Sequence, residues 1–382
     1  MGVERTGMLL LDGAWQPGRI VWEDQAITEI EVLPGLDPAA RDLFVAPGMI
    51  DLHVHGFGGA DPLENLGSMA RAMARVGTTA FQPTLFPRTP AELGLQARAL
   101  DGERLRLRPG DGARVLGTHL EGPFVNPRSA GALPVEDLAL PGRDALRELL
   151  GPAMGDGLGI GTITLAPELP GASDLIAECV ALGLRVSIGH SLASGEQAMA
   201  AFAAGAQGVT HLFNAMPAFH HRKTGLVGEA LLRGGVFAEI IGDLVHVGER
   251  AVQLALAARG PASLCLVSDA LQGAGTGCDV FHSHGRRHII QDGAAYYPAG
   301  PERDVPQLAG SASSQLDMVR RLTSRGVVGS ADALTMATLA PARALGMQDR
   351  IGQLKVGLQS DLIVLRGHRL NLVETVVAGR SQ

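Results

Sequence analysis

The chain has 382 residues, 46% of them hydrophobic, and its formal charge is −7 because 39 Asp and Glu outnumber 32 Lys and Arg. A nucleic-acid or anionic-membrane surface needs clustered positive charge, so this balance argues against both partners. The length allows a large core in one big domain with a small one beside it, or in two domains.

The cysteines indicate the compartment. Cys179, Cys265 and Cys278 are odd in number and show no CxxC spacing, a pattern typical of free thiols in a reducing environment. No segment reaches the ~18 consecutive apolar residues of a membrane span, and the apolar run near the N-terminus is too short for a signal peptide. We therefore expect a cytoplasmic protein.

Both ends of the chain alternate apolar and polar residues as strands do. The N-terminal part does so over residues 8–11, 19–22 and 26–30, and the C-terminal part over 361–365 and 372–377. Each end offers too few strands to bury a sheet face, so we expect the two to pair into one small β-sandwich domain. The predicted small domain comprises residues 1–47 and 346–382, and a larger domain spans residues 48–345.

Within the larger domain, short apolar runs alternate with longer segments rich in Ala, Leu, Arg and Glu, as in repeated βα units. The runs cover residues 48–55, 79–85, 114–121, 159–167, 185–190, 208–211, 236–243 and 264–269. Eight parallel strands close a barrel. The sequence therefore predicts an α/β fold, a (β/α)8 barrel with a small β domain.

Histidine and carboxylate residues stand at the ends of these runs. In a barrel of parallel strands the chemistry sits at the carboxyl ends, where such residues would converge. Imidazole and carboxylate groups suit Zn, Fe, Mn or Co, so we expect one or two divalent ions. Asp269 has no histidine beside it and suits a base that takes a proton from water and later passes it to a leaving group. The predicted metal ligands are His53, His55, Glu121, His190 and His211.

Several motifs carry a family resemblance. Residues 46–56, APGMIDLHVHG, resemble the opening metal motif of the amidohydrolase superfamily. The segments HLEGPF at 119–124 and HLFNAM at 211–216 resemble, more narrowly, the N-acetylglucosamine-6-phosphate deacetylases. This resemblance implies a metal-dependent hydrolase, with Zn or Fe favoured, that converts N-acetylglucosamine 6-phosphate to glucosamine 6-phosphate and acetate in amino-sugar catabolism.

The resemblance also implies substrate contacts. It assigns the phosphate to Asn214, Ala215, Arg222 and His246, and the sugar pocket to residues 308–310, which are Leu308, Ala309 and Gly310. In the family the matching arginine reaches the neighbouring subunit's site. A homodimer is therefore implied, with Arg222 contributed by the partner.

One loop departs from the family pattern. Where the family commonly has Gly-x-His, this chain has Gly131-Ala132-Leu133, and leucine cannot donate a hydrogen bond to a carbonyl oxygen. Either the metal alone polarises the carbonyl, or His119 or His246 substitutes, or the sugar specificity differs. The alternatives of N-acetylgalactosamine 6-phosphate or another N-acyl sugar as substrate, and of a non-catalytic scaffold, therefore stay open.

A second group of basic residues follows the eighth run. His282, His284 and His288 stand with Arg286 and Arg287 in a segment that we expect to form a projecting hairpin. Alternation predicts that its three histidines share one solvated face.

Overall fold

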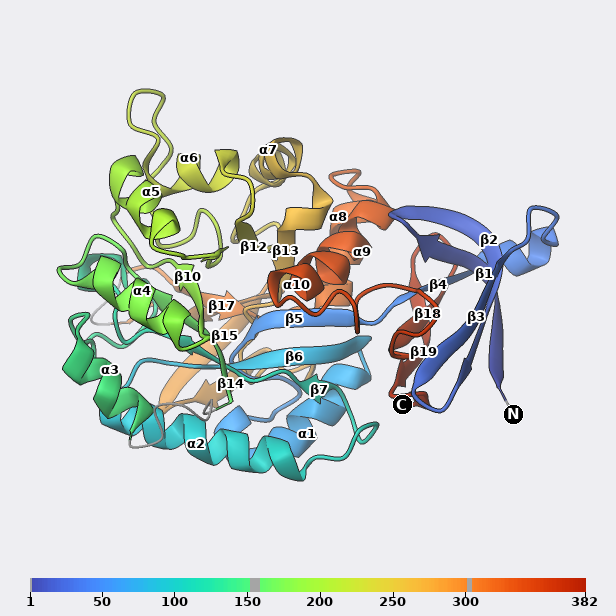
Figure 1. Ribbon diagram of the computed structural model, residues 1–382, viewed down its shortest axis with the longest axis horizontal. Helices are drawn as coiled ribbons and strands as arrows, with labels where there is room; N and C mark the ends of the chain where they lie inside the picture. The colour runs from blue at the N-terminus through green and yellow to red at the C-terminus, as the bar shows by residue number, and fades with distance from the viewer. Residues whose placement is uncertain (1, 152–158, 301–303) are drawn as a thin grey trace.

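The computed structural model describes residues 2–151, 159–300 and 304–382; Met1 of the predicted small domain and residues 152–158 and 301–303 of the predicted larger domain lie outside that part. Figure 1 shows a large body of strands and helices, with a smaller body of strands at one end that holds both chain termini. Among the described helices, none is both long and apolar enough to cross a membrane.

Parallel strands form the centre of the large body. Within the described residues, eight of them follow one another in sequence order: β5 (Met49–Val54), β6 (Thr78–Leu85), β8 (Thr118–Glu121), β9 (Ile160–Leu165), β10 (Arg185–Ile188), β11 (Gly208–Val209), β12 (Phe237–Ile241) and β13 (Leu264–Val267). The short strand β7 (Arg114–Val115) pairs with β6. The two ends of the sheet meet where Val54 bridges to Ala270, and where Asp269 donates its backbone N–H to the oxygen of His53 over 2.8 Å. The predicted barrel is confirmed.

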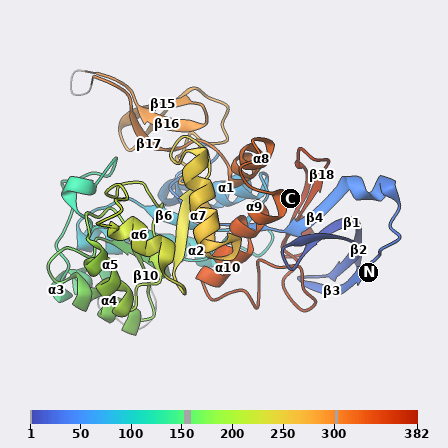
Figure 2. The same cartoon turned by 90° about the horizontal axis from the view of Figure 1, so that it is seen from above.

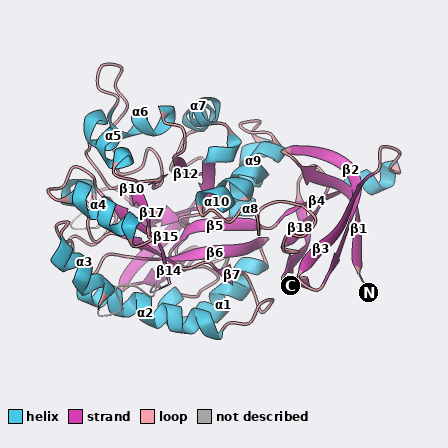
Figure 3. Cartoon of the chain, viewed as in Figure 1, coloured by secondary structure: helices cyan, strands magenta, loops and turns pink. Residues whose placement is uncertain are grey.

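Helices cover the outside of the barrel (Figure 3). They turn apolar faces inward, as in α1, where Leu66, Met69 and Met73 recur at helical spacing and are buried. The described helices are α1 (Pro62–Ala74), α2 (Pro90–Arg106), α3 (Arg143–Leu150), α4 (Ala172–Ala181), α5 (Gly195–Ala203), α6 (Gly225–Leu232), α7 (Glu249–Arg259), α8 (Gln315–Ser324), α9 (Ser330–Ala337) and α10 (Leu339–Ala344), with short 3-10 helices at Pro38–Asp42, Pro127–Ser129 and Pro261–Ser263.

The two ends of the chain build the small body together, as predicted. In the described chain its sheet runs in the order β20 (Arg380–Ser381), β19 (Asn371–Val377), β18 (Leu362–Arg366), β4 (Leu43–Pro47), β1 (Val3–Leu11), β2 (Ala14–Glu23) and β3 (Ala26–Val32). β18 joins the two halves because it pairs antiparallel with β4, placing Ile363 opposite Ala46. Leu9, Trp22 and Val364 share a core separate from that of the barrel.

We propose that the domain boundaries lie where the sequence places them. The last N-terminal strand of the small sheet, β4, ends at Pro47, and the first barrel strand, β5, begins at Met49. At the other side, α10 ends at Ala344 before the chain returns to the small sheet.

A further antiparallel sheet, named here the hairpin sheet, stands off the barrel mouth (Figure 2). It consists of β14 (Val280–Ser283), β15 (Arg286–Gln291), β16 (Ala294–Tyr297) and β17 (Gln307–Ser311). The expected hairpin is present, but the prediction that its three histidines share one face is wrong. The turn pairs Phe281 with His288 and His282 with Arg287, so His288 and His282 point to opposite faces. His288 is buried and stacks on Phe281, with ring centres 4.6 Å apart.

We expect the core of the small sheet to be needed for stability. Trp22 is 2% exposed, so replacing Trp22 by Ala removes a large buried side chain and should lower the free energy of unfolding by about 3–5 kcal/mol. Differential scanning calorimetry measures the change in Tm. Val32→Ala, at a position 47% exposed in the same sheet, should leave Tm nearly unchanged. Equal shifts in the two variants would contradict this role of the core.

Candidate metal centre

The barrel brings the six predicted chemical residues to one place. They come from the ends of five strands: His53 and His55 from β5, Glu121 from β8, His190 after β10, His211 after β11 and Asp269 after β13. The five predicted ligands are buried, and the Asp269 side chain is 14% exposed. His190, His211 and Asp269 have φ of 45°, 31° and 48°, a left-handed backbone that is costly outside glycine and clusters at functional sites.

One group of ligand atoms consists of Glu121, His190 and His211. The Glu121 Oε1 atom lies 3.1 Å from the Nε2 atoms of both histidines, and those two nitrogens lie 2.9 Å apart. His190 donates from Nδ1 to the backbone oxygen of Ser129 over 3.0 Å, so in the neutral ring its Nε2 carries a lone pair. Acceptor atoms therefore face one another here, an arrangement that a shared cation stabilises.

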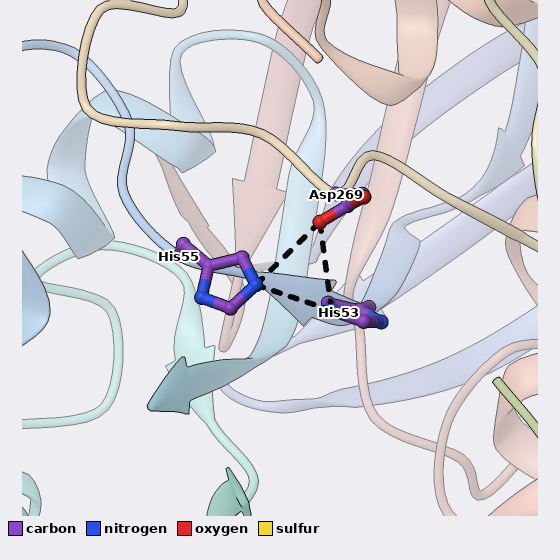
Figure 4. A group of neighbouring side chains, drawn as sticks. All are labelled: His53, His55 and Asp269. Atoms are coloured by element: carbon purple, nitrogen blue, oxygen red, sulfur yellow. Dashed lines mark hydrogen bonds and ion pairs between the residues drawn. The ribbon is translucent and has the colours of Figure 1, made fainter. Parts of the chain in front are cut away.

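A second group consists of His53, His55 and Asp269 (Figure 4). The Nε2 atoms of His53 and His55 lie 3.3 Å apart, and each is 3.5 Å from Asp269 Oδ1. Glu121 joins the two groups, because its carboxylate oxygens also approach His53 Nε2 at 3.3 Å and His55 Nε2 at 3.2 Å. The centre thus has the shape of two adjoining metal sites with Glu121 between them.

The electrostatics of the centre favour positive charge. Burial disfavours a charged His53, yet the carboxylates of Glu121 and Asp269 raise the pKa of His53 well above its ordinary value. Burial also opposes ionisation of Glu121, but His53 and His190 hold the pKa of its carboxyl well below the usual range. These opposed shifts mean that the buried carboxylate stays ionised and attracts a cation.

Glu239 of β12 is a buried residue of the centre that the sequence analysis missed. Its Oε2 accepts the Nδ1–H of His53 at 3.1 Å and the backbone N–H of His211 at 3.3 Å. The first contact leaves His53 Nε2 free to bind a metal. An acidic residue inside the apolar run 236–243 was a detectable signal, since an unpaired buried carboxylate is costly.

Glu168, which follows β9, was also missed. It accepts hydrogen bonds from Asn126 Nδ2 at 2.8 Å, from Ser191 Oγ at 2.7 Å and from the backbone N–H of Leu192 at 2.6 Å. These contacts tie the loop after Glu121 to the loop that carries His190.

His119 is fully buried and does not line the cavity, so its alternative role at a substrate carbonyl is wrong. Its Nε2 lies 2.8 Å from Thr164 Oγ1 and its Nδ1 lies 3.2 Å from the backbone oxygen of Leu52. Burial lowers the pKa of His119 to about 3, so the ring is neutral. His119, His53 and Glu239 also bring ligand atoms together, but both nitrogens of His119 already face protein partners.

A cavity of about 210 Å³ opens above the centre. Besides ligand-group residues, it is lined by the predicted contacts Asn214, Ala215, His246, Leu308, Ala309 and Gly310, and by Leu133. His246 is held by Asp243, whose Oδ2 lies 2.6 Å from its Nδ1. Of the two histidines considered as substitutes at the carbonyl, His246 lines the cavity.

Arg222 does not reach the cavity of its own chain. It lies exposed on the segment between β11 and α6, which extends away from the barrel (Figure 1), and its Nη1 contacts His221 Nε2 at 2.8 Å. Within a single subunit, the predicted substrate contact of Arg222 is therefore absent.

The chain has close relatives of known function. The pattern of the amidohydrolase family matches residues 44–381. The N-acetylglucosamine-6-phosphate deacetylase of Bos taurus is 34% identical, covering 98% of this chain and 92% of its own. The N-acetylgalactosamine-6-phosphate deacetylase of Escherichia coli O157:H7 is 32% identical, with coverages of 95% and 94%. A mutant N-acetyl-D-glucosamine-6-phosphate deacetylase from Mycobacterium smegmatis, solved in complex with N-acetyl-D-glucosamine-6-phosphate, is similar in structure, with TM-score 0.86, 26% identity and coverages of 100% and 99%.

The contact between Glu239 and His53 predicts a selective effect on metal affinity. Glu239→Gln should lower the affinity for the divalent ion held by His53 and His55 by ~10–100-fold, because the variant removes the carboxylate that orients His53. An ion held by Glu121, His190 and His211 should bind as before. Titration of metal-stripped protein with Zn²⁺ or Co²⁺ measures both affinities, with Glu249→Gln on α7 as the control. An unchanged isotherm would exclude an orienting role for Glu239.

Proposed function

The chain belongs to the amidohydrolase family, and we propose that it hydrolyses the acetamide of N-acetylglucosamine 6-phosphate to acetate and glucosamine 6-phosphate. The observation that carries this proposal is the convergence of Glu121, His190, His211 and Asp269 beneath the 210 Å³ cavity. This geometry occurs in a chain similar over nearly its whole length to deacetylases of this specificity.

The residues of the centre fit a divalent metal, since nitrogen and carboxylate acceptors face one another there at 2.9–3.1 Å. Glu121, His190 and His211 would hold one ion, and His53 and His55 a second. The donor set suits Zn²⁺ or Fe²⁺, with Mn²⁺ and Co²⁺ as alternatives. When bound, the metal polarises the amide carbonyl and makes the attacking water more acidic.

Asp269 is the proposed general base and acid. Its backbone is fixed on both sides, because it donates to the oxygen of His53 and accepts from the N–H of Ser311, each over 2.8 Å. The carboxylate faces both the cavity and the second ligand group. It would take a proton from the water whose oxygen bonds to the carbonyl carbon, then pass a proton to the nitrogen as the C–N bond breaks.

Asn214, Ala215 and His246 are the proposed phosphate contacts within the subunit, and Leu308, Ala309 and Gly310 the contacts with the sugar. We propose a cytoplasmic homodimer in which the partner supplies Arg222. Three observations support the dimer: Arg222 is exposed, it lies outside its own cavity, and Phe219 beside it is 52% exposed. In the partner's cavity Arg222 would bind phosphate well, because a guanidinium donates two hydrogen bonds at once.

N-acetylgalactosamine 6-phosphate is the second candidate substrate, favoured by the Escherichia coli relative and by the apolar Leu133 in the cavity. Acetate release from both phosphorylated sugars and from unphosphorylated N-acetylglucosamine tests the proposal on metal-loaded protein. Rapid release from N-acetylglucosamine 6-phosphate is expected. No release from any of the three would contradict deacetylation.

Asp269→Asn should lower kcat by about 10²–10⁴-fold, because an amide cannot accept the proton of the attacking water. Metal content, measured by atomic emission, shows whether the centre survives in the variant. Retention of kcat in a metal-loaded variant would rule out Asp269 as the base.

Arg222→Ala should raise KM for the phosphorylated sugar by roughly tenfold or more, because one charge-assisted contact is lost. The unphosphorylated sugar should be unaffected, and Arg250→Ala on α7 serves as the control. Mixed dimers distinguish the two subunits: combining Arg222→Ala with Asp269→Asn chains should restore one intact site per heterodimer. Absence of restored activity in heterodimers would show that Arg222 does not act across the interface.

A further inference from the structure

A second cavity of about 100 Å³ adjoins the cavity above the metal centre. The two share Phe86, Ala132 and Ala309 in their linings. The hairpin sheet, to which the proposed function gives little part, supplies most of the outer wall through Ser283, His284, Arg286, His288 and Tyr297.

The wall is attached to the loop that departs from the family pattern. Tyr297 donates its hydroxyl to the backbone oxygen of Ala132 at 3.4 Å, and Gln307 Nε2 donates to the oxygen of Gly131 at 3.0 Å. The second cavity is therefore bounded by connected elements, which gives it a defined shape.

The barrel topology places the second cavity on the acyl side of the substrate. Phe86 follows the second barrel strand and Asn214 follows the sixth, and in an eight-stranded barrel these two strands lie across from each other. In a hexosamine 6-phosphate, the ring carbon that bears the acylamino group lies opposite the carbon that bears the phosphate arm. With the phosphate at Asn214, as the proposed function has it, the acyl group points toward Phe86.

The lining changes from apolar to charged along this direction. Phe86, Ala132 and Ala309 form an apolar neck, which suits methylene groups. Beyond it stand Arg286, whose guanidinium lies 5.4 Å from the Tyr297 ring centre, and Arg88.

Of the two arginines in this lining, Arg88 is offset by a neighbouring acid, whereas Arg286 forms no ion pair within the described residues. Glu136 is an exposed acid of the lining, while Asp137 pairs with Arg88 at 3.5 Å and Asp61 lies 3.4 Å from His284. Burial lowers the pKa of His284, and it lowers the pKa of His288 to about 4. Both rings are thus neutral near pH 7, so within the described residues Arg286 is the cation of this lining that no acid contacts.

We propose that the second cavity is an acyl subsite and that the enzyme also hydrolyses N-acyl glucosamine 6-phosphates whose acyl chain is longer than acetyl and ends in a carboxylate, such as N-succinyl. The chemistry is the same hydrolysis: the water oxygen bonds to the amide carbon, the C–N bond breaks, and the amine leaves with a proton. The products are a dicarboxylate and glucosamine 6-phosphate, with no further reactant.

The test compares kcat/KM for N-acetyl-, N-butyryl- and N-succinylglucosamine 6-phosphate. Butyryl has the same chain length as succinyl but no charged end. One charge-assisted contact predicts at least a tenfold preference for succinyl over butyryl. Arg286→Ala should remove that preference and leave the acetyl substrate unchanged, whereas Arg287→Ala should alter nothing, because Arg287 lines neither cavity.

Ser283→Phe gives an independent check by filling the second cavity. This variant should no longer hydrolyse the butyryl and succinyl substrates. Its turnover of the acetyl substrate should be unchanged, and that unchanged turnover also shows that the variant is folded. No preference for succinyl, or a preference that survives Arg286→Ala, would overturn the acyl subsite. Failure of the proposed function is a different result, since the acetyl substrate would then be inert in the unmodified enzyme.

Discussion

One buried carboxylate organises the centre of this protein. Glu121 lies within 3.3 Å of ring nitrogens from four histidines, which come from three different strand ends. Acceptor atoms at this separation repel one another unless a cation lies among them. The barrel overcomes that repulsion by fixing the backbone of each strand, and the metal-dependent chemistry of the family follows from the same arrangement.

A layer of polar residues behind the ligands makes the arrangement specific. Glu239 orients His53 through Nδ1, and the Ser129 carbonyl does the same for His190. Glu168 holds two of the loops together. Such outer contacts choose which ring nitrogen faces the metal, so they matter nearly as much as the ligands themselves.

The features that distinguish this chain lie in segments outside the regular barrel units. Leu133 and Ala132 stand in a loop after the third barrel strand, and the hairpin sheet follows the eighth. The barrel supplies the metal centre, while these segments line the two cavities beside it. Specificity can therefore differ among relatives that share the same catalytic residues.

The sequence alone was sufficient to predict the barrel and the group of residues at its mouth. The apolar runs match the strands because parallel strands buried on both faces are apolar throughout. His53, Glu121 and Asp269 end those runs, and strand ends must converge when a barrel closes. Pairing of the two chain ends followed in the same way, since neither could bury a sheet face alone.

Only the tertiary structure decided which polar groups meet. Glu239 and His53 are 186 residues apart, and no local pattern reports their contact. His119 and Glu121 stand two residues apart on the same strand and therefore point to the same, inner face. Only Glu121 lines the cavity, while His119 is fully buried and contacts Thr164 and the backbone of Leu52. At the hairpin, a two-residue turn sets the pairing that separates His282 from His288. Arg222 lies outside its own cavity because its segment extends away from the barrel. Sequence periodicity records which side of an element is buried, whereas the partner on that side is set by how distant elements pack.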